Sequence, residues 1–217
     1  MNGNQIIPVT GISNREFFRQ YARAGCVGLV SGVTLIEKVI RRVERHVDAD
    51  KQPSLWSHAL IFEGQRFDDH HWVFESDLDL HRKHIRLGVQ ENRVDKYYDA
   101  DLYPTLAVLD FQLTADQTAA VLREALRLVA RRSTYSLREL IGTAVALRNP
   151  WFRGRKNLLA RRRSMYCSAF VQYVFQKAGL DLVPGIHPSH NSPEDISRTT
   201  IPHTTYLLQR ALGSGQH

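Results

Sequence analysis

The sequence lacks the features that identify several common classes of protein. Its 217 residues include only two cysteines, Cys26 and Cys167, which excludes a scaffold held together by many disulfides. No run of about 18 apolar residues occurs, so no membrane-spanning helix is predicted. Zinc-finger spacing, an RNP-type aromatic signature and a glycine-rich phosphate loop are all absent. These absences argue against the common nucleotide-binding and nucleic-acid-binding modules.

The N-terminal residues, Met1 to Val9, lack a charged segment followed by an apolar stretch. No secretory signal is therefore predicted, and the chain as given is expected in the cytoplasm. Removal of a leader, or export by a dedicated secretion system, would change that expectation.

The composition is that of one folded domain with a basic excess. Apolar residues make up 43% of the chain and charged residues 24%, while the formal net charge is +7. Much of this excess lies in Asn149–Arg163 (NPWFRGRKNLLARRR). The simpler interpretation of this run is a solvated loop that leads into a helix. The alternative is a surface that contacts an acidic partner or anionic lipid, with nucleic acid as a weaker hypothesis.

Hydrophobic periodicity predicts an α+β fold with an antiparallel sheet. Alternating residues predict a hairpin of two strands, Ser57–Phe62 and His71–Ser76, around a turn at Gly64–Asp69. Three more strands are predicted at Cys26–Ser31, Ile85–Gln90 and Thr105–Leu113. Helical spacing and capping residues predict helices at Glu16–Ala24, Thr34–His46, Thr114–Arg131, Tyr135–Leu147 and Ser164–Ala178.

Cys167 is the first candidate for chemistry. If Ser164 is the N-cap, Cys167 lies in the first turn of its helix, where free backbone N–H groups and the helix dipole favour a thiolate. The same N–H groups could help to hold an oxyanion. The alternative is that Cys167 simply begins the buried apolar stripe of that helix. Cys26 lies in a predicted strand and is interpreted as a core residue.

His58 and Glu75 extend the pattern. His58 begins a strand and shares a face with Leu60 and Phe62, so it is either a core histidine or a base directed at another group. Glu75 ends the partner strand, within reach of His58 if the hairpin closes. A thiol, an imidazole and a carboxylate form a Cys-His-acid triad. His70 or His71 is the alternative third member.

The remaining histidines predict no metal site. His81 and His84 are three residues apart, but no cysteine or carboxylate completes a ligand set with them and His70 or His71. His187 and His190 lie in a loop that could rim a cleft.

Four segments in order resemble the permuted NlpC/P60 superfamily, and within it the YaeF/YiiX-like papain-like amidases. They are a glycine-led strand, a Ser-His strand, a strand that ends in Val-Phe-Glu, and a Cys-Ser helix, and a Ser-Pro-Glu-Asp pattern follows them. In this chain the four segments are Gly25–Ser31, Ser57–Ile61, Val73–Glu75 and Tyr166–Val171, and the pattern that follows them is Ser192–Asp195. The resemblance covers roughly residues 25–200.

The resemblance implies a circularly permuted papain-like fold and a cysteine hydrolase. Cys167 would be the nucleophile, His58 the base and Glu75 the third polar residue, while Tyr166 would line the substrate site. No cofactor is implied. Ala169-Phe170 replaces the acidic-aliphatic pair often seen after Cys-Ser, and the basic segment 148–163 is atypical of the family. Both departures bear on the substrate rather than on the chemistry.

The predicted domain plan has three parts. Residues 1–24 are an N-terminal extension, residues 25–212 are the hydrolase domain with a helical and basic insert at about 114–163, and residues 213–217 are a tail. The expected substrate is a peptide amide of the cell wall or an acyl group of a lipid, with hydrolysis or transfer as the outcome. The alternative function is a non-catalytic binding module that contacts an anionic partner through the basic segment.

Overall fold

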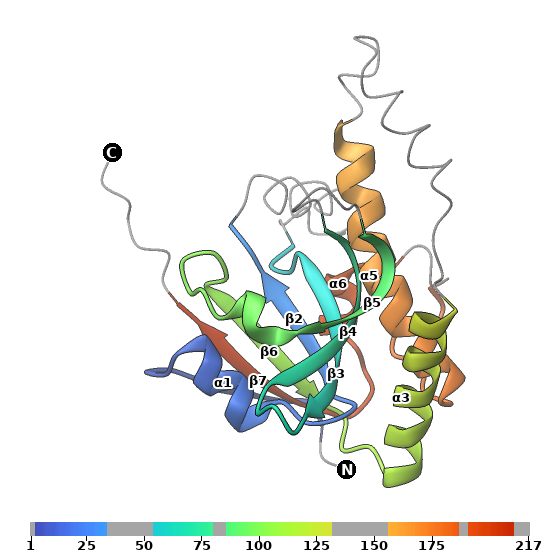
Figure 1. Ribbon diagram of the computed structural model, residues 1–217, viewed down its shortest axis with the longest axis horizontal. Coiled ribbons are helices and arrows are strands. Elements are labelled where there is room, and N and C mark those ends of the chain that lie inside the picture. The colour runs from blue at the N-terminus through green and yellow to red at the C-terminus, as the bar shows by residue number, and fades with distance from the viewer. Residues whose placement is uncertain (1–2, 34–53, 80–85, 132–155, 187–190, 211–217) are drawn as a thin grey trace.

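The computed structural model describes residues 3–33, 54–79, 86–131, 156–186 and 191–210 (Figure 1). They form a seven-stranded sheet with the strand order β1-β7-β6-β2-β3-β4-β5. The strands are β1 (Gln5–Val9), β2 (Val27–Ser31), β3 (His58–Gln65), β4 (His71–Asp79), β5 (Arg86–Arg93), β6 (Thr105–Asp110) and β7 (Thr204–Gln209). All neighbouring strands are antiparallel except β1 and β7, which run parallel.

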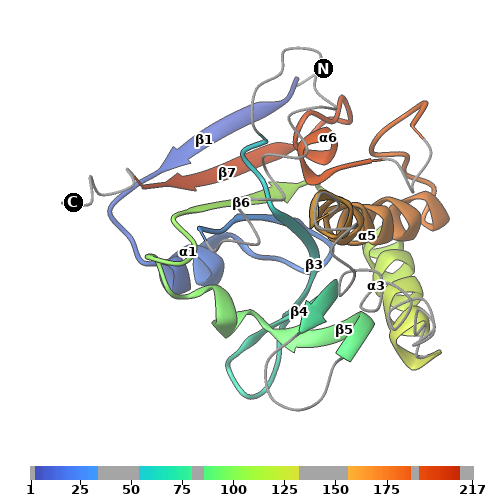
Figure 2. The same ribbon diagram turned by 90° about the horizontal axis from the view of Figure 1, so that it is seen from above.

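Helices cover both sides of this curved sheet. They are α1 (Asn14–Tyr21), the short 3-10 helix η1 (Val94–Tyr97), α3 (Ala115–Ala130), α5 (Lys156–Lys177) and α6 (Pro193–Ser197). Seen from above, α1 lies on one side of the sheet, while α5 and α3 lie on the other (Figure 2). α5 packs against β3, β4, α3 and α6. The fold is therefore mixed α+β, with the sheet between two helical layers.

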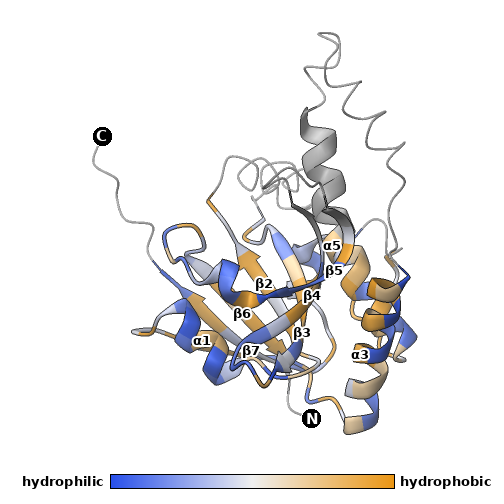
Figure 3. Ribbon diagram, in the orientation of Figure 1, coloured by the Kyte–Doolittle hydropathy of each residue, from blue (hydrophilic) through white to orange (hydrophobic). Residues whose placement is uncertain are grey.

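The alternation of side chains along β3 divides the core in two. Ala59 and Ile61 join a cluster with residues of α5, α3 and α6, here named the α5-side cluster. Leu60 and Phe62 join a cluster with Phe17 and other residues of α1 and η1, here named the α1-side cluster. Figure 3 shows the hydrophobic residues gathered along central strands such as β2 and β6, which are buried on both faces.

Several predicted elements are confirmed by the structure. The hairpin of β3 and β4 forms as predicted, with Ile61 opposite Phe74 and an irregularity in register between Phe62 and Gly64. α3 begins with the predicted capping box: the N–H of Gln117 donates to Thr114 Oγ1 at 3.2 Å, and Gln117 Oε1 accepts from the Thr114 N–H at 3.0 Å.

The predicted end of the Ser164–Ala178 helix is confirmed to within one residue, since α5 ends at Lys177. Gly179 has a φ of 84°, a left-handed conformation that glycine adopts without steric cost. The N–H of Leu180 donates to the carbonyl of Phe175 at 2.9 Å, and the N–H of Gly179 to that of Gln176 at 3.0 Å. These two bonds satisfy the last helical carbonyls in the pattern of a Schellman motif.

The predicted start of this helix is wrong. Ser164 is not an N-cap, because α5 begins at Lys156 and passes through Ser164 without interruption. The intervening sequence, Asn157–Arg163, is rich in leucine, alanine and arginine, which are among the strongest helix formers, so the helix extends toward its N-terminus. The sheet is not wholly antiparallel either, since β1 and β7 run parallel. Strands β1 and β7 and helix α6 were not predicted.

Residues assigned to an N-terminal extension take part in the same fold. β1 supplies an edge strand beside β7, and Phe17 and Phe18 of α1 are buried in the α1-side cluster. The domain limits remain a prediction. The predicted helices Thr34–His46 and Tyr135–Leu147 lie outside the described residues. Among the helices that the structure describes, none combines the length and the hydrophobicity needed to cross a membrane.

Candidate active site

Three elements bring Cys167, His58 and Glu75 together. His58 is the first residue of β3, Glu75 lies on the neighbouring strand β4, and Cys167 lies in the middle of α5, which packs against both strands. All three residues are buried, with 7% of His58 exposed and none of Glu75 or Cys167. A hairpin and a helix that are far apart in sequence therefore place a thiol, an imidazole and a carboxylate in one buried region.

The His58 ring connects the other two groups. Its Nε2 lies 2.8 Å from Oε2 of Glu75, so an Nε2–H donates to the carboxylate. The Cys167 side chain forms a hydrogen bond with His58 as well. Because Glu75 occupies Nε2, the nitrogen left for the thiol is Nδ1. The carboxylate thus fixes both the orientation of the ring and the nitrogen that faces sulfur.

The electrostatics of this site favour a protonated imidazole. Burial alone lowers the pKa of His58, since it penalises the charged form. The negative charge of Cys167, the hydrogen bonds to Cys167 and Glu75, and the charge of Glu75 each act in the opposite direction to burial. Their combined effect raises the pKa of His58 from 6.5 to about 10. A protonated imidazole that bonds a cysteine can in general stabilise the thiolate form of that cysteine.

Glu75 has further partners that the sequence did not reveal. The Tyr97 hydroxyl donates to Oε2 at 2.7 Å, while Asn92 Nδ2 donates to Oε1 at 2.7 Å. Lys96 Nζ lies 2.5 Å from Oε1. A buried carboxylate is tolerated only with such partners, and together with His58 they hold it in one orientation. Tyr97 and Lys96 belong to η1, directly after β5, so only the pairing of β4 with β5 brings them to Glu75.

Cys167 does not occupy the position that was expected for it. It lies in the interior of α5, not in the first turn, so the free N–H groups and the positive end of the helix dipole are remote. Inside a helix the backbone N–H is used by the helical ladder and is not available to an oxyanion. The contact with His58 is therefore the feature of the structure that supports a reactive thiol at this position.

Cys26 provides the contrast. It is buried in the α1-side cluster, as predicted for a core residue, and both cysteines are free thiols. Burial, and to a lesser degree the charge of Asp110, raise the pKa of Cys26 to about 12. A thiol of this kind is inert at neutral pH.

The other predicted site residues lie elsewhere or outside the described residues. His70 Nδ1 pairs with Asp95 at 2.8 Å, and His71 is buried without contacting His58. Tyr166 precedes Cys167 on α5, but its side chain is outside the description, so its predicted role in lining the substrate site remains a prediction. His81, His84, His187 and His190 lie outside the described residues.

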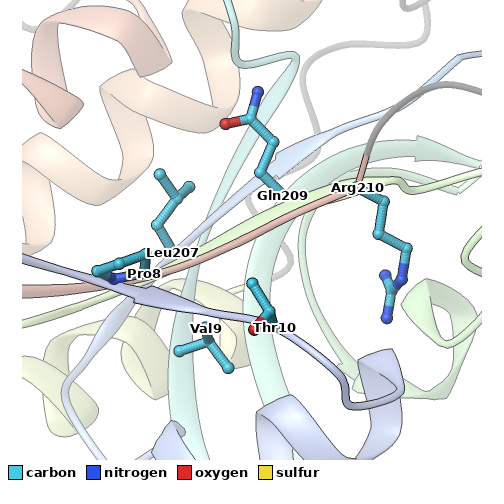
Figure 4. A pocket seen from close by; sticks show the side chains of 6 residues that line it. All are labelled: Pro8, Val9, Thr10, Leu207, Gln209 and Arg210. Atoms are coloured by element: carbon cyan, nitrogen blue, oxygen red, sulfur yellow. The ribbon is translucent and has the colours of Figure 1, made fainter.

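A pocket of about 380 Å³ lies at the opposite part of the sheet (Figure 4). It is lined by Pro8, Val9 and Thr10 of β1 and its end, and by Leu207, Gln209 and Arg210 of β7 and its end. Two strands, β6 and β2, separate β7 from β3, the strand that carries His58, in the sheet order β7-β6-β2-β3. This pocket contains no nucleophile or base and does not belong to the site around Cys167.

Comparison with known proteins identifies a shared fold. No protein-family model matches the chain, and no curated protein matches it in sequence. Among solved structures, the metalloprotein YiiX from Escherichia coli O157:H7, a DUF1105 protein, is similar with a TM-score of 0.50. The match has 14% sequence identity and covers 84% of this chain and 95% of YiiX. Identity this low establishes a similarity of fold alone.

Because YiiX is a metalloprotein, the fit of this site to a metal ion is of interest. In the part of the chain that the structure describes, no group of three or more His, Cys, Asp or Glu side chains is arranged to hold a metal ion. Among the described side chains of the site, His58 and Cys167 bond one another, and both Glu75 oxygens accept from donors. His58 and Cys167 supply half of a tetrahedral set, so these residues do not fit a metal centre.

Proposed function

We propose that this protein is a cysteine hydrolase of the permuted papain-like kind, with Cys167 as nucleophile, His58 as base and Glu75 as the group that orients the base. One observation carries the proposal: the buried His58 ring bonds Glu75 through Nε2 and also bonds Cys167, and its pKa is raised beyond neutrality. A structural histidine needs a partner for its N–H, but it does not need a thiol on one side and a fully satisfied carboxylate on the other.

The reaction follows from this arrangement. The Cys167 sulfur attacks the carbonyl carbon of an amide or ester, and the carbonyl electron pair moves onto oxygen. When the tetrahedral intermediate collapses, the bond to the leaving nitrogen or oxygen breaks and His58 gives that atom its proton. A thioester with Cys167 remains. Water, deprotonated by His58, then attacks this thioester and releases the acid, unless another acceptor takes the acyl group.

Three further observations support the permuted papain-like assignment. The similarity to YiiX extends over most of both chains, and the sequence motifs resemble the YiiX-like amidases. The order of the site residues also fits a permuted chain, since the strands with His58 and Glu75 precede the helix with Cys167.

The substrate class follows from the resemblance and has two members, a peptide amide of the cell wall and an acyl group of a lipid. Both present a carbonyl to the sulfur, so the chemistry of the site accepts either. The alternative of a binding module rests on the basic segment, and residues 149–155 of that segment lie outside the described residues. No observed contact favours it over the enzyme.

Trapping of the covalent intermediate tests the proposal. The full chain is incubated separately with a p-nitrophenyl ester, a cell-wall stem peptide and phospholipid vesicles, and the intact mass is recorded. We expect an acyl adduct on the peptide that contains Cys167, formed with at least one of these probes and absent from Cys167→Ala. No adduct with any probe, together with equal alkylation of Cys167 and Cys26, would contradict the proposal.

A further inference from the structure

A short segment of the chain touches both halves of the candidate site. The Ser168 hydroxyl, on the residue after Cys167, donates to the backbone carbonyl of Asn191 at 2.8 Å. Three residues further on, Glu194 Oε2 accepts from the N–H of Leu55 at 3.0 Å and from the Ser54 hydroxyl at 3.2 Å. Residues 191–195 therefore link the nucleophile helix to the segment that leads directly into His58.

That leading segment is hydrogen-bonded to Glu194. From Ser57 onward the chain is held by β2, since the Ser57 N–H donates to the carbonyl of Val30 at 2.9 Å. Before Ser57 the contacts are different. The single Ser54 hydroxyl proton is shared between the carbonyl of Trp56, at 2.9 Å, and Glu194 Oε2, and Ser54 Oγ accepts from the Trp56 N–H at 3.2 Å. The Glu194 carboxylate joins this tight turn to α6 through hydrogen bonds, while Trp56 and Leu55 pack in the α5-side cluster.

Glu194 is itself held by a well-capped helix. The Ser192 hydroxyl accepts from the Asp195 N–H at 3.2 Å, and Asp195 Oδ2 accepts from the Ser192 N–H at 2.7 Å. Pro193 begins α6 with its backbone φ already set for a helix, and Ile196 is buried in the α5-side cluster. The Ser-Pro-Glu-Asp sequence thus builds a rigid helix whose second residue points at the turn before His58.

We propose that Glu194 is a positioning residue that sets the separation of Cys167 and His58. The proposal rests on the proposed function of that pair. Glu194 does not touch the reacting atoms; it acts through the turn that places the first residue of β3. Its side chain is 19% exposed, and its second oxygen, Oε1, accepts from Arg198 Nε at 3.1 Å. Oε2 of Glu194 therefore bonds the turn before His58, and Oε1 forms a surface ion pair with Arg198.

This division of the two oxygens defines a matched set of variants. Glu194→Ala removes both acceptors from the turn. Glu194→Gln retains one carbonyl oxygen that can accept from Leu55 and Ser54. Arg198→Ala removes only the surface partner and leaves the contact with the turn intact. The measurement is the rate of Cys167 alkylation by iodoacetamide in the native protein from pH 5 to 10, followed by peptide mass spectrometry, with thermal unfolding recorded in parallel.

The expected result is a change in the chemistry of the folded protein. If His58 is displaced, it interacts less strongly with the Cys167 thiol. Glu194→Ala should therefore slow Cys167 alkylation at pH 7 about tenfold, and the alkylation rate should rise at a higher pH than in the wild type. The Cys167 alkylation rate of Glu194→Gln should stay within about threefold of the wild-type rate. The rate of Arg198→Ala should equal the wild-type rate. If Glu194→Ala does not fold, Ser54→Ala replaces it, because it removes one of the two contacts, and it should slow alkylation by about threefold.

Failure of this proposal differs from failure of the proposed function. If Glu194→Ala lowers the unfolding temperature but leaves the pH profile unchanged, Glu194 is only structural and the positioning role is overturned. An unchanged profile for Ser54→Ala has the same meaning. If wild-type Cys167 already reacts as slowly as Cys26, the hydrolase assignment fails, and the positioning role fails with it.

Discussion

The two cysteines of this protein are equally hidden but differ in their neighbours. Cys26 is 3% exposed and Cys167 is fully buried, so solvent access gives neither thiol an advantage. Cys26 lies in the α1-side cluster among apolar groups, and burial raises its pKa to about 12. Cys167 lies in the α5-side cluster but bonds His58. Under the proposed function, the partner ring and not exposure is what distinguishes the thiol of Cys167 from that of Cys26.

His58 itself lies where the two clusters meet. Its ring lies 6.2 Å from the ring of Tyr97, a member of the α1-side cluster, and bonds Cys167 of the α5-side cluster. The polar site thus lies between two apolar layers, which exclude water from the imidazole and strengthen each of its charge interactions.

The largest expected effect comes from removal of the base. His58→Ala should lower the rate of Cys167 alkylation, and of any hydrolysis found, by about 100-fold or more, because the sulfur loses its charge partner. The alkylation rate of Cys26 should not change. Peptide-level mass spectrometry measures both thiols in one sample, so Cys26 is the internal control. Equal slowing of both cysteines would show a general loss of access instead.

Removal of the orienting carboxylate should have a large effect on stability. Glu75→Gln leaves His58 and Lys96 buried or half-buried without their counter-charge. We expect a loss of about 3–5 kcal/mol in the free energy of unfolding, together with slower Cys167 alkylation. Urea denaturation measures the first and labelling the second. A loss of stability below about 1 kcal/mol would mean that the four contacts to Glu75 contribute little to the fold.

The titration of His58 should depend on Cys167. In the native protein the pKa of His58 is raised to about 10, and the charge of Cys167 is the largest of the effects that raise it. Cys167→Ala removes that charge and its hydrogen bond, so the midpoint should fall toward 6.5, while Glu75 still opposes the effect of burial. NMR of the His58 ring over pH 5–11 gives both midpoints. An unchanged midpoint in Cys167→Ala would show that the sulfur carries no charge near the ring.

The smallest effect is expected at Cys26. Cys26→Ala removes one sulfur from an apolar cluster and should cost about 1–2 kcal/mol of unfolding free energy. The His58 titration and the reactivity of Cys167 should stay at wild-type values, since the substitution lies in the cluster on the other side of the sheet. A shift of the His58 titration midpoint in this variant would show that the surroundings of Cys26 and Cys167 are coupled, and would contradict the contrast between them.

Local pattern was enough to predict much of the fold. Alternation along Ser57–Phe62 and His71–Ser76 predicted the hairpin, and Thr114 with Gln117 predicted the start of α3, because both signals depend on residues that are close in sequence. The pairing of β1 with β7 was not predicted, because it joins segments about 200 residues apart. The predicted start of α5 was wrong. Ser164 is a plausible N-cap, but the sequence before it strongly favours a helix, so the helix begins earlier, at Lys156.

The site was predictable only in part. The predicted hairpin placed Glu75 within reach of His58, and in the structure Glu75 Oε2 lies 2.8 Å from Nε2 of the His58 ring. Asn92, Lys96 and Tyr97 carry no local signal, because their relation to Glu75 arises from the pairing of β4 with β5 and from the 3-10 turn that follows. The link from Glu194 to Ser54 is equally invisible in sequence, since it spans 140 residues.

The most direct test of the account is the ratio of the alkylation rates of Cys167 and Cys26 in the native wild-type protein at pH 7. With a pKa of about 12, only about one Cys26 molecule in 10⁵ is a thiolate at this pH. If His58 activates Cys167, its rate should exceed that of Cys26 by about 1,000-fold or more, and the ratio should fall to near one when the protein is unfolded in urea. Equally slow alkylation of both cysteines in the native state would contradict the account.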